Sequence, residues 1–205
     1  MPKIPQGQYD EVLREEVPQL YAAFQAVDAE NLKYRPTLTV IICGKRHRAR
    51  FFPSASTDTG AENSRNTCPG TVVDKGVASV VDFDFYLQAH AGGLHSAPKS
   101  THYVVIYDES AITPDAVQQG VHSASYLYAR TNSAVSLVPP AYYADILCDR
   151  ARCWIEEYLL AEDSAGGKIL SLGQEKLEAD RVFEAVKCAW GDGLHYNLRD
   201  SMFYI

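Results

Sequence analysis

An α/β fold is predicted for this chain of 205 residues by the order of its apolar patterns. Short runs rich in β-branched residues alternate with longer segments in which apolar residues recur every three or four positions. Such alternation is typical of strands that alternate with helices. The hydrophobic share of 46% and the charged share of 22% are those of an ordinary globular protein. The length is enough for one sizeable domain or two small ones.

The first part of the chain is expected to hold one helix and one strand. The helix is predicted over residues 8–33, where apolar residues recur at intervals of four and three: Leu13, Val17, Leu20, Phe24 and Val27. Pro18 should kink this helix or mark its first turn. The β-rich run 36–43 is expected to be a buried strand that leads directly into the basic segment KRHRAR.

The middle of the chain is expected to hold three further strands, at 70–74, 81–87 and 101–109. The polar stretch 53–69 and the glycine-containing stretch 89–100 should be loops between them.

A second helix is expected after Thr113-Pro114-Asp115, because a capping threonine, a proline in the first position and an acid in the first turn are typical of a helix start. This helix should bury four side chains, those of Val117, Val121, Ala124 and Tyr128. Beyond it, a strand is expected at 133–138, a helix at 140–160, a break at 161–173 and a last helix at 174–190.

Composition also predicts where the protein works. No apolar run approaches the roughly 20 residues that span a bilayer, and the first residues lack a secretory apolar core. The five cysteines contain no CxxC pair, and the six histidines form no HxH or HExxH pair, so we expect a reducing compartment and no zinc site. A soluble protein of the cytoplasm, and also of the nucleus, with no membrane partner is therefore expected.

The charge is unevenly distributed. The formal net charge of −7 alone argues against a nucleic-acid partner. However, residues 44–52, GKRHRARFF, gather four lysines and arginines around a histidine, and a second basic pair is Arg150 and Arg152. Phosphates respond to such local fields and not to the total. The run 44–52 is either a row of cations for a nucleic-acid backbone or the charged end of a strand that prevents edge-to-edge pairing.

The helix over 140–160 carries polar side chains on one face, at steps of three or four residues: Tyr142, Asp145, Asp149 and Arg152. One interpretation is a solvated face with an Asp149–Arg152 pair, worth about a few tenths of a kcal/mol. The other is a carboxylate for a divalent metal and an arginine for a phosphate, which its planar fork binds with two hydrogen bonds. Similarly, His90, Tyr128 and Tyr142 are either ordinary structural residues or ligand contacts.

The order of the motifs resembles a known family. The stretches GQYDEVL, KRHRARFF, GTVVD, FDFYLQAHAG, THYVVIYDE and YLYARTNSAVSLVPPAYYAD, followed by an aromatic chain end, resemble the carboxy-terminal part of the PIWI domain of eukaryotic Argonaute proteins. The resemblance covers about residues 7–160 and the last few residues, whereas 161–200 fall where the family is variable. We therefore expect residues 1–205 to form part of one PIWI domain.

The resemblance implies an α/β fold of the ribonuclease H-like type, here an incomplete mixed sheet with flanking helices. It also implies RNA-guided gene silencing (RNA interference), in which a guide RNA directs cleavage of a target RNA. In this family four residues hold two Mg²⁺ or Mn²⁺ ions. Asp145 follows the motif PAYYA and so matches the fourth, which makes it the candidate catalytic residue and metal ligand.

The resemblance further implies contacts with the guide RNA. Matching positions are Lys45, Arg48 and Arg50 of the KRHRAR segment, His90 and Lys99 around HAG, the set Tyr128, Arg130, Ser136 and Tyr142, and Arg150 with the chain-end residue Ile205 near the guide 5′ phosphate. One departure is that Thr131, Asn132 and Ser133 replace a segment that ends in a basic residue in many relatives.

Three of the four metal ligands are not expected in this chain, since Pro2 stands where the family aspartate should be. The upstream PIWI and MID segments are expected to be missing, so the chain is interpreted as a fragment. It should neither hold the metal stably nor cleave RNA alone, although its parent can be a slicer endoribonuclease. Two alternatives remain: a stand-alone, non-catalytic RNA-binding module or competitor, and an unrelated α/β enzyme that uses Asp145 and Asp149 as an acid/base pair.

Overall fold

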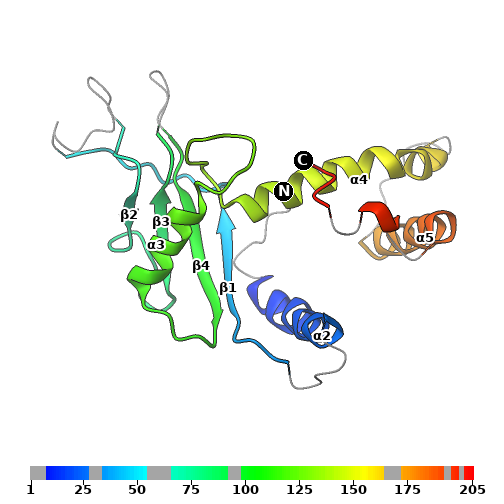
Figure 1. Cartoon of the computed structure of the whole chain (residues 1–205), viewed down its shortest axis with the longest axis horizontal. Coiled ribbons are helices and arrows are strands. Elements are labelled where there is room, and N and C mark those ends of the chain that lie inside the picture. The colour runs from blue at the N-terminus through cyan, green and yellow to red at the C-terminus, as the bar shows by residue number, and fades with distance from the viewer. Residues whose placement is uncertain are drawn as a thin grey trace. The chain divides into compact units, whose positions relative to one another are not determined.

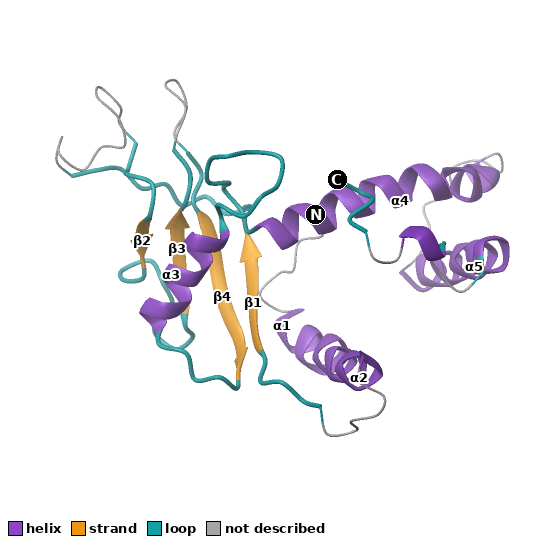
Figure 2. Cartoon of the chain, in the orientation of Figure 1, coloured by secondary structure: helices purple, strands orange, loops and turns teal. Residues whose placement is uncertain are grey.

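The computed structural model describes residues 8–27, 34–54, 66–91, 98–163, 172–191, 195–198 and 201–205. The chain forms two compact units, Met1–Pro139 and Pro140–Ile205, and each is described by itself. Figure 1 shows the order of the elements, and Figure 2 shows their kinds.

The first unit begins with a helical segment in three parts. Helix α1 spans Tyr9–Glu11, a π-helical turn spans Val12–Glu16, and helix α2 spans Val17–Val27. Pro18 has no N–H to donate to the preceding turn, and the wider π-helical turn lies directly before it, as expected for a disturbed hydrogen-bond ladder. The helix predicted over 8–33 is thus confirmed for 9–27, and residues 28–33 lie outside the described part.

Four strands form one antiparallel sheet in the order β1-β4-β3-β2. Their bounds are Thr39–Gly44 (β1), Thr71–Val73 (β2), Asp84–Gln88 (β3) and Thr101–Asp108 (β4). The predicted α/β class with flanking helices is confirmed. The four strands are confirmed too, each shorter than predicted, although β1 and β3 end one residue later than expected. The three pairings recorded among the described residues are all antiparallel.

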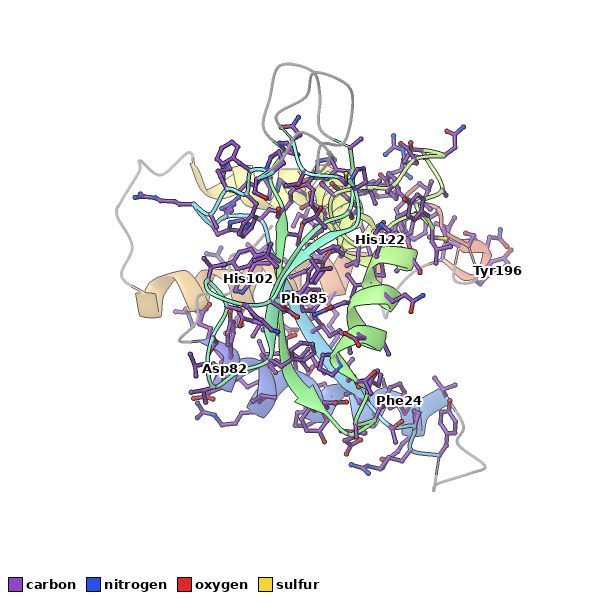
Figure 3. All side chains as sticks on the ribbon, turned by 90° about the vertical axis from the view of Figure 1, so that its left-hand side faces the viewer. Phe24, Asp82, Phe85, His102, His122 and Tyr196 are labelled. Carbon is purple, nitrogen blue, oxygen red and sulfur yellow. The ribbon has the colours of Figure 1, made fainter. Side chains whose placement is uncertain are left out.

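The core lies between the sheet and helix α3, Pro114–Ala124, which crosses one face of the sheet in Figure 1. Phe85, Leu87 and Tyr103 are almost fully buried and pack with Val117 and Val121 of α3. Figure 3 shows His102 on the side of the sheet away from α3, as the alternation of side chains along β4 requires.

Three expectations for this part need correction. Ala124 is only half-buried, and Tyr128 lies in the turns beyond the end of α3 and is also half-buried. The strand predicted at 133–138 is absent, because the segment is a loop in which Leu137 is buried and Val138 packs against the core. Its apolar residues anchor the loop one by one, and the neighbouring backbone bond, Val135 N to Ser125 O at 2.9 Å, stays local.

A β-bulge turns part of β4 toward α2. Val40 pairs with Tyr107 while Ile41 pairs with Val105, so one residue of β4 is unpaired and the faces beyond it are exchanged. The Tyr107 hydroxyl therefore lies 3.3 Å from that of Tyr21 in α2. Both tyrosines donate to Glu109, which also accepts from Arg35, and this cluster joins α2 to the sheet.

The second unit contains helix α4, Pro139–Asp163, helix α5, Leu172–Trp190, a short 3₁₀ turn at Tyr196–Leu198 and the chain end. Both predicted helices are confirmed, although α4 continues three residues into the predicted break. No helix in the described ranges combines the length and apolar character that a membrane crossing requires.

Candidate nucleic-acid interface

One end of the sheet collects three of the predicted basic residues of the first unit. The register pairs Gly44 of β1 with His102 and Leu87 of β3 with Thr101, so β1 and β3 end where β4 begins. This is the upper end of the sheet in Figure 1. Lys45, His90 and Lys99 come from three separate segments and meet at this end because of that register.

Lys45 is held there in an unusual state for a lysine. Its side chain is half-buried, and its ammonium group donates a hydrogen bond to the Ser136 hydroxyl. Burial, and secondarily the nearby charge of Lys99, lower the pKa of Lys45 below its ordinary value. Within the described residues neither lysine forms an ion pair with a carboxylate. A desolvated cation without an anion attracts one.

His90 follows β3 at the same end and is half-buried. Burial, and then the charge of Lys45, lower the pKa of His90, so its ring is neutral at neutral pH. The Gln88 amide donates to the His90 carbonyl over 2.7 Å and holds the loop against the end of the strand.

His47 was not in the predicted set, yet it lies at the same end. Its Nε2 is 2.7 Å from the Ser100 carbonyl oxygen, and its ring packs against Tyr86 with centroids 5.1 Å apart. Its pKa is lowered, chiefly by burial and further by Lys99. His47 stands inside the basic segment KRHRAR, but only the structure shows that burial alternates along that segment. Lys45 and His47 are half-buried, whereas the three arginines between and beyond them are exposed: Arg46, Arg48 and Arg50.

The remaining predicted residues of the first unit are less closely gathered. Arg48 and Arg50 are exposed, and the Arg50 guanidinium donates to its neighbour's carbonyl, Ala49 O, at 2.8 Å. Arg130 is exposed in the turns after α3, two residues beyond half-buried Tyr128. Ser136 is the exception, since its hydroxyl accepts from Lys45 and its carbonyl accepts from the buried Thr101 hydroxyl.

The predicted residues of the second unit lie on α4 and at the chain end. Tyr142 and Asp145 are half-buried near the start of α4. Arg150, further along the helix, donates to the Phe203 carbonyl, and the Tyr143 and Tyr204 rings pack with centroids 6.2 Å apart. Ile205 closes a turn onto the Met202 carbonyl at 3.1 Å. The structure therefore brings Arg150 together with the last residues of the chain.

The described residues do not by themselves fit a two-metal site. Asp145 supplies one carboxylate, and no group of three or more histidine, cysteine or acidic side chains that could hold a metal occurs in the described part of the chain. Two divalent ions need several oxygen ligands. The alternative Asp149–Arg152 pair is also not found, since the ion pairs recorded for the described residues join Arg35 to Glu109 and His102 to Asp84.

Comparison with known proteins explains this combination of fold and basic residues. Residues 4–156 match the Piwi domain family. Protein argonaute MEL1 of Oryza sativa subsp. japonica is 35% identical over 202 residues, which is 98% of this chain but 18% of that protein. The chain thus spans about a fifth of the length of the relatives it matches.

Solved structures agree with this match. The crystal structure of Kluyveromyces polysporus Argonaute with a guide RNA has a TM-score of 0.74 and 26% identity, and the match covers 99% of this chain and 22% of that one. The C-terminal lobe of a budding yeast Argonaute has a TM-score of 0.72 and 25% identity, with 99% and 38% covered. The resemblance inferred from the motifs is confirmed, and the unrelated acid/base enzyme is ruled out: the chain belongs to the Piwi domain family.

Proposed function

We propose that this chain contributes the guide-facing surface of an Argonaute and binds the phosphate backbone of a small guide RNA during RNA-guided silencing. Family membership supports this role, and so does the similarity to an Argonaute that was crystallised with a guide RNA. The observation that carries it is Lys45, a half-buried cation beside Lys99 with no carboxylate partner in the described structure.

The physics of the sheet end favours phosphate over other partners. A phosphate oxygen would pair with the Lys45 ammonium and offset the repulsion between Lys45 and Lys99. Exposed Arg48 and Arg50 would extend the positive field along the bound RNA backbone. Backbone contacts of this kind hold any base sequence. The target RNA would then be selected by pairing with the guide.

The second unit is proposed to serve the guide 5′ end. Arg150 donates to the Phe203 carbonyl, so its guanidinium and Ile205 lie in one small region of that unit. Tyr142 of the same unit is proposed as a contact with the first nucleotides. Tyr128 and Arg130 of the first unit are proposed as guide contacts on the motif resemblance alone. These assignments follow the motif resemblance. We also propose that the protein acts in the cytoplasm and in the nucleus.

Asp145 is proposed as one ligand of the Mg²⁺ or Mn²⁺ site of a complete PIWI domain, where the metal supplies an activated water. For the chain by itself we propose a non-catalytic RNA-binding role, because one carboxylate without a metal-binding cluster among the described residues cannot position two ions. Upstream PIWI and MID segments are the proposed protein partners.

Binding of a short, 5′-phosphorylated single-stranded RNA, measured by fluorescence anisotropy, tests the proposal. Lys45→Met should weaken binding about tenfold, the loss expected for one charge-assisted hydrogen bond. Lys75→Met removes the same charge from an exposed position after β2, at the opposite end of the sheet, and should have little effect. Equal effects of the two substitutions would overturn the proposal.

A further inference from the structure

Gln88, the last residue of β3, is a buried polar residue that the motif comparison did not single out, with 2% of its surface exposed. Both ends of its amide are bonded. Its Oε1 accepts from the Ser100 hydroxyl at 3.1 Å, and its Nε2 donates to the His90 carbonyl at 2.7 Å. Exchanging the two atoms would turn Oε1 against the carbonyl oxygen of His90, so the network determines the orientation of the amide.

This orientation determines where His90 carries its proton. Nε2 of Gln88 also lies 3.4 Å from Nδ1 of the His90 ring. An amide nitrogen only donates, so the ring Nδ1 must be the acceptor and the proton must sit on the ring Nε2. A doubly protonated ring would direct a second N–H at the amide N–H and is disfavoured.

We propose that Gln88 is a positioning residue that holds His90 as a neutral Nε2–H donor for a non-bridging phosphate oxygen of an RNA backbone beside Lys45. The inference rests on the proposed function and deepens it, since it assigns different roles to the two neighbouring groups. Lys45 supplies charge, and His90 supplies a directed hydrogen bond without adding a third cation to Lys45 and Lys99.

The buried contacts make this arrangement rigid. Gln88 and Ser100 are the chain neighbours of Leu87 and Thr101, which pair across β3 and β4, and both are almost fully buried. The Ser100 carbonyl in turn binds His47, so one amide links both half-buried histidines of this end. The Gln88 amide and the Ser100 hydroxyl are both paired, and displacing either would leave a buried polar group without its partner.

The test uses the full chain without RNA and records long-range ¹H–¹⁵N correlations of the histidine rings, with the His90 signals assigned by their loss in His90→Asn. At neutral pH the wild-type His90 ring should show the Nε2–H tautomer. Gln88→Leu removes the donor, so the His90 signals should move toward a mixture of tautomers. An Nδ1–H tautomer in the wild type, or unchanged signals in Gln88→Leu, would overturn the inference.

Gln88→Glu is the second variant. It keeps the acceptor for Ser100 but replaces the donor that faces His90, so the ring should take up a proton on Nδ1 and its pKa should rise. RNA binding completes the test: Gln88→Leu should weaken it about threefold to tenfold, as expected for a misdirected hydrogen bond. If Lys45→Met does not weaken RNA binding, both the proposed function and this inference are refuted. If Lys45→Met weakens binding but the His90 signals do not change in Gln88→Leu, only this inference is refuted.

Discussion

The Glu109 carboxylate accepts the hydrogen bonds that join α2 to the sheet. Hydrogen bonds from Tyr21 and Tyr107 lower its pKa from 4.5 to about 2, with Arg35 adding to the effect. The same contacts raise the pKa of Tyr21, where burial acts most strongly. A carboxyl group whose pKa is lowered by folding stabilises the folded state only while it is ionised.

Glu109→Gln should therefore lower the free energy of unfolding at neutral pH. The difference from the wild type should be complete above about pH 4.5 and shrink as the pH falls toward about 2, where the wild-type carboxyl is protonated as well. Urea unfolding of both proteins across this range measures the difference. In a Tyr21→Phe background, which lacks one donor to Glu109, the difference should be smaller. A difference that stays constant down to pH 3 would contradict the assignment.

Gly70 is a backbone position where a side chain is excluded. Its φ of +90° is rarely adopted by other residues, and an added Cβ would lie 3.3 Å from the buried ring of His122. Gly70→Ala should destabilise the protein by about 1–3 kcal/mol, because backbone strain and a contact with a ring add. Chemical denaturation gives the value. Gly120→Ala in α3, where no atom lies within 4 Å, should instead stabilise by about 0.5–1 kcal/mol.

At the scale of elements, the start of α3 shows how a local signal becomes a stable helix. The Thr113 hydroxyl accepts from the Ala116 N–H at 3.4 Å, and Pro114 follows in the first helical position. Thr113→Ala should cost about 0.5–1 kcal/mol, the lower part of the range for lost caps because this bond is long. Thr113→Ser keeps the cap and should recover most of the loss, as thermal unfolding monitored by circular dichroism can show. Equal losses in both variants would refute the capping role.

The elements that the sequence predicted well are those with a local cause. Period, capping and proline placement located α3, α4 and the four strands. The strand predicted at 133–138 was wrong, because Leu137 and Val138 are apolar in order to anchor a loop on the core. The bulge at Val40 and Ile41 could not be foreseen, since it arises only when β1 and β4 pair.

The candidate site divides in the same way. Motifs supplied Lys45, His90 and Lys99, whose residue types already point to phosphate. They missed His47, Gln88 and Ser100, because those act through hydrogen bonds between residues 53 and 12 positions apart, and sequence pattern does not report such contacts. The register of β3 and β4 is the physical link that brings these residues together.

At the scale of the whole molecule, the number of carboxylates available to bind metal limits whether the chain alone can cleave RNA. We expect no cleavage of a target RNA paired to a bound guide when the purified chain is incubated with Mg²⁺ or Mn²⁺, because the described residues offer no cluster of metal ligands around Asp145. Denaturing gels of end-labelled target measure the result. Metal-dependent products that disappear in Asp145→Ala would show that the chain completes the site by itself.

The negative net charge of the chain opposes RNA binding, whereas the local positive charge at one end of the sheet favours it. The chain carries −7 overall, yet Lys45 and Lys99 lie at one end of the sheet, and exposed Arg48 and Arg50 follow Lys45 in the chain. If these cations contact three or four phosphates, the logarithm of the binding constant should fall with the logarithm of salt concentration with a slope of about −2 to −3. Replacing both Arg48 and Arg50 by glutamine should make the slope shallower by about 1.4, whereas Lys75→Met should leave it unchanged. A slope near zero in the wild type would mean that the overall negative charge prevails and that this end of the sheet does not meet a phosphate backbone.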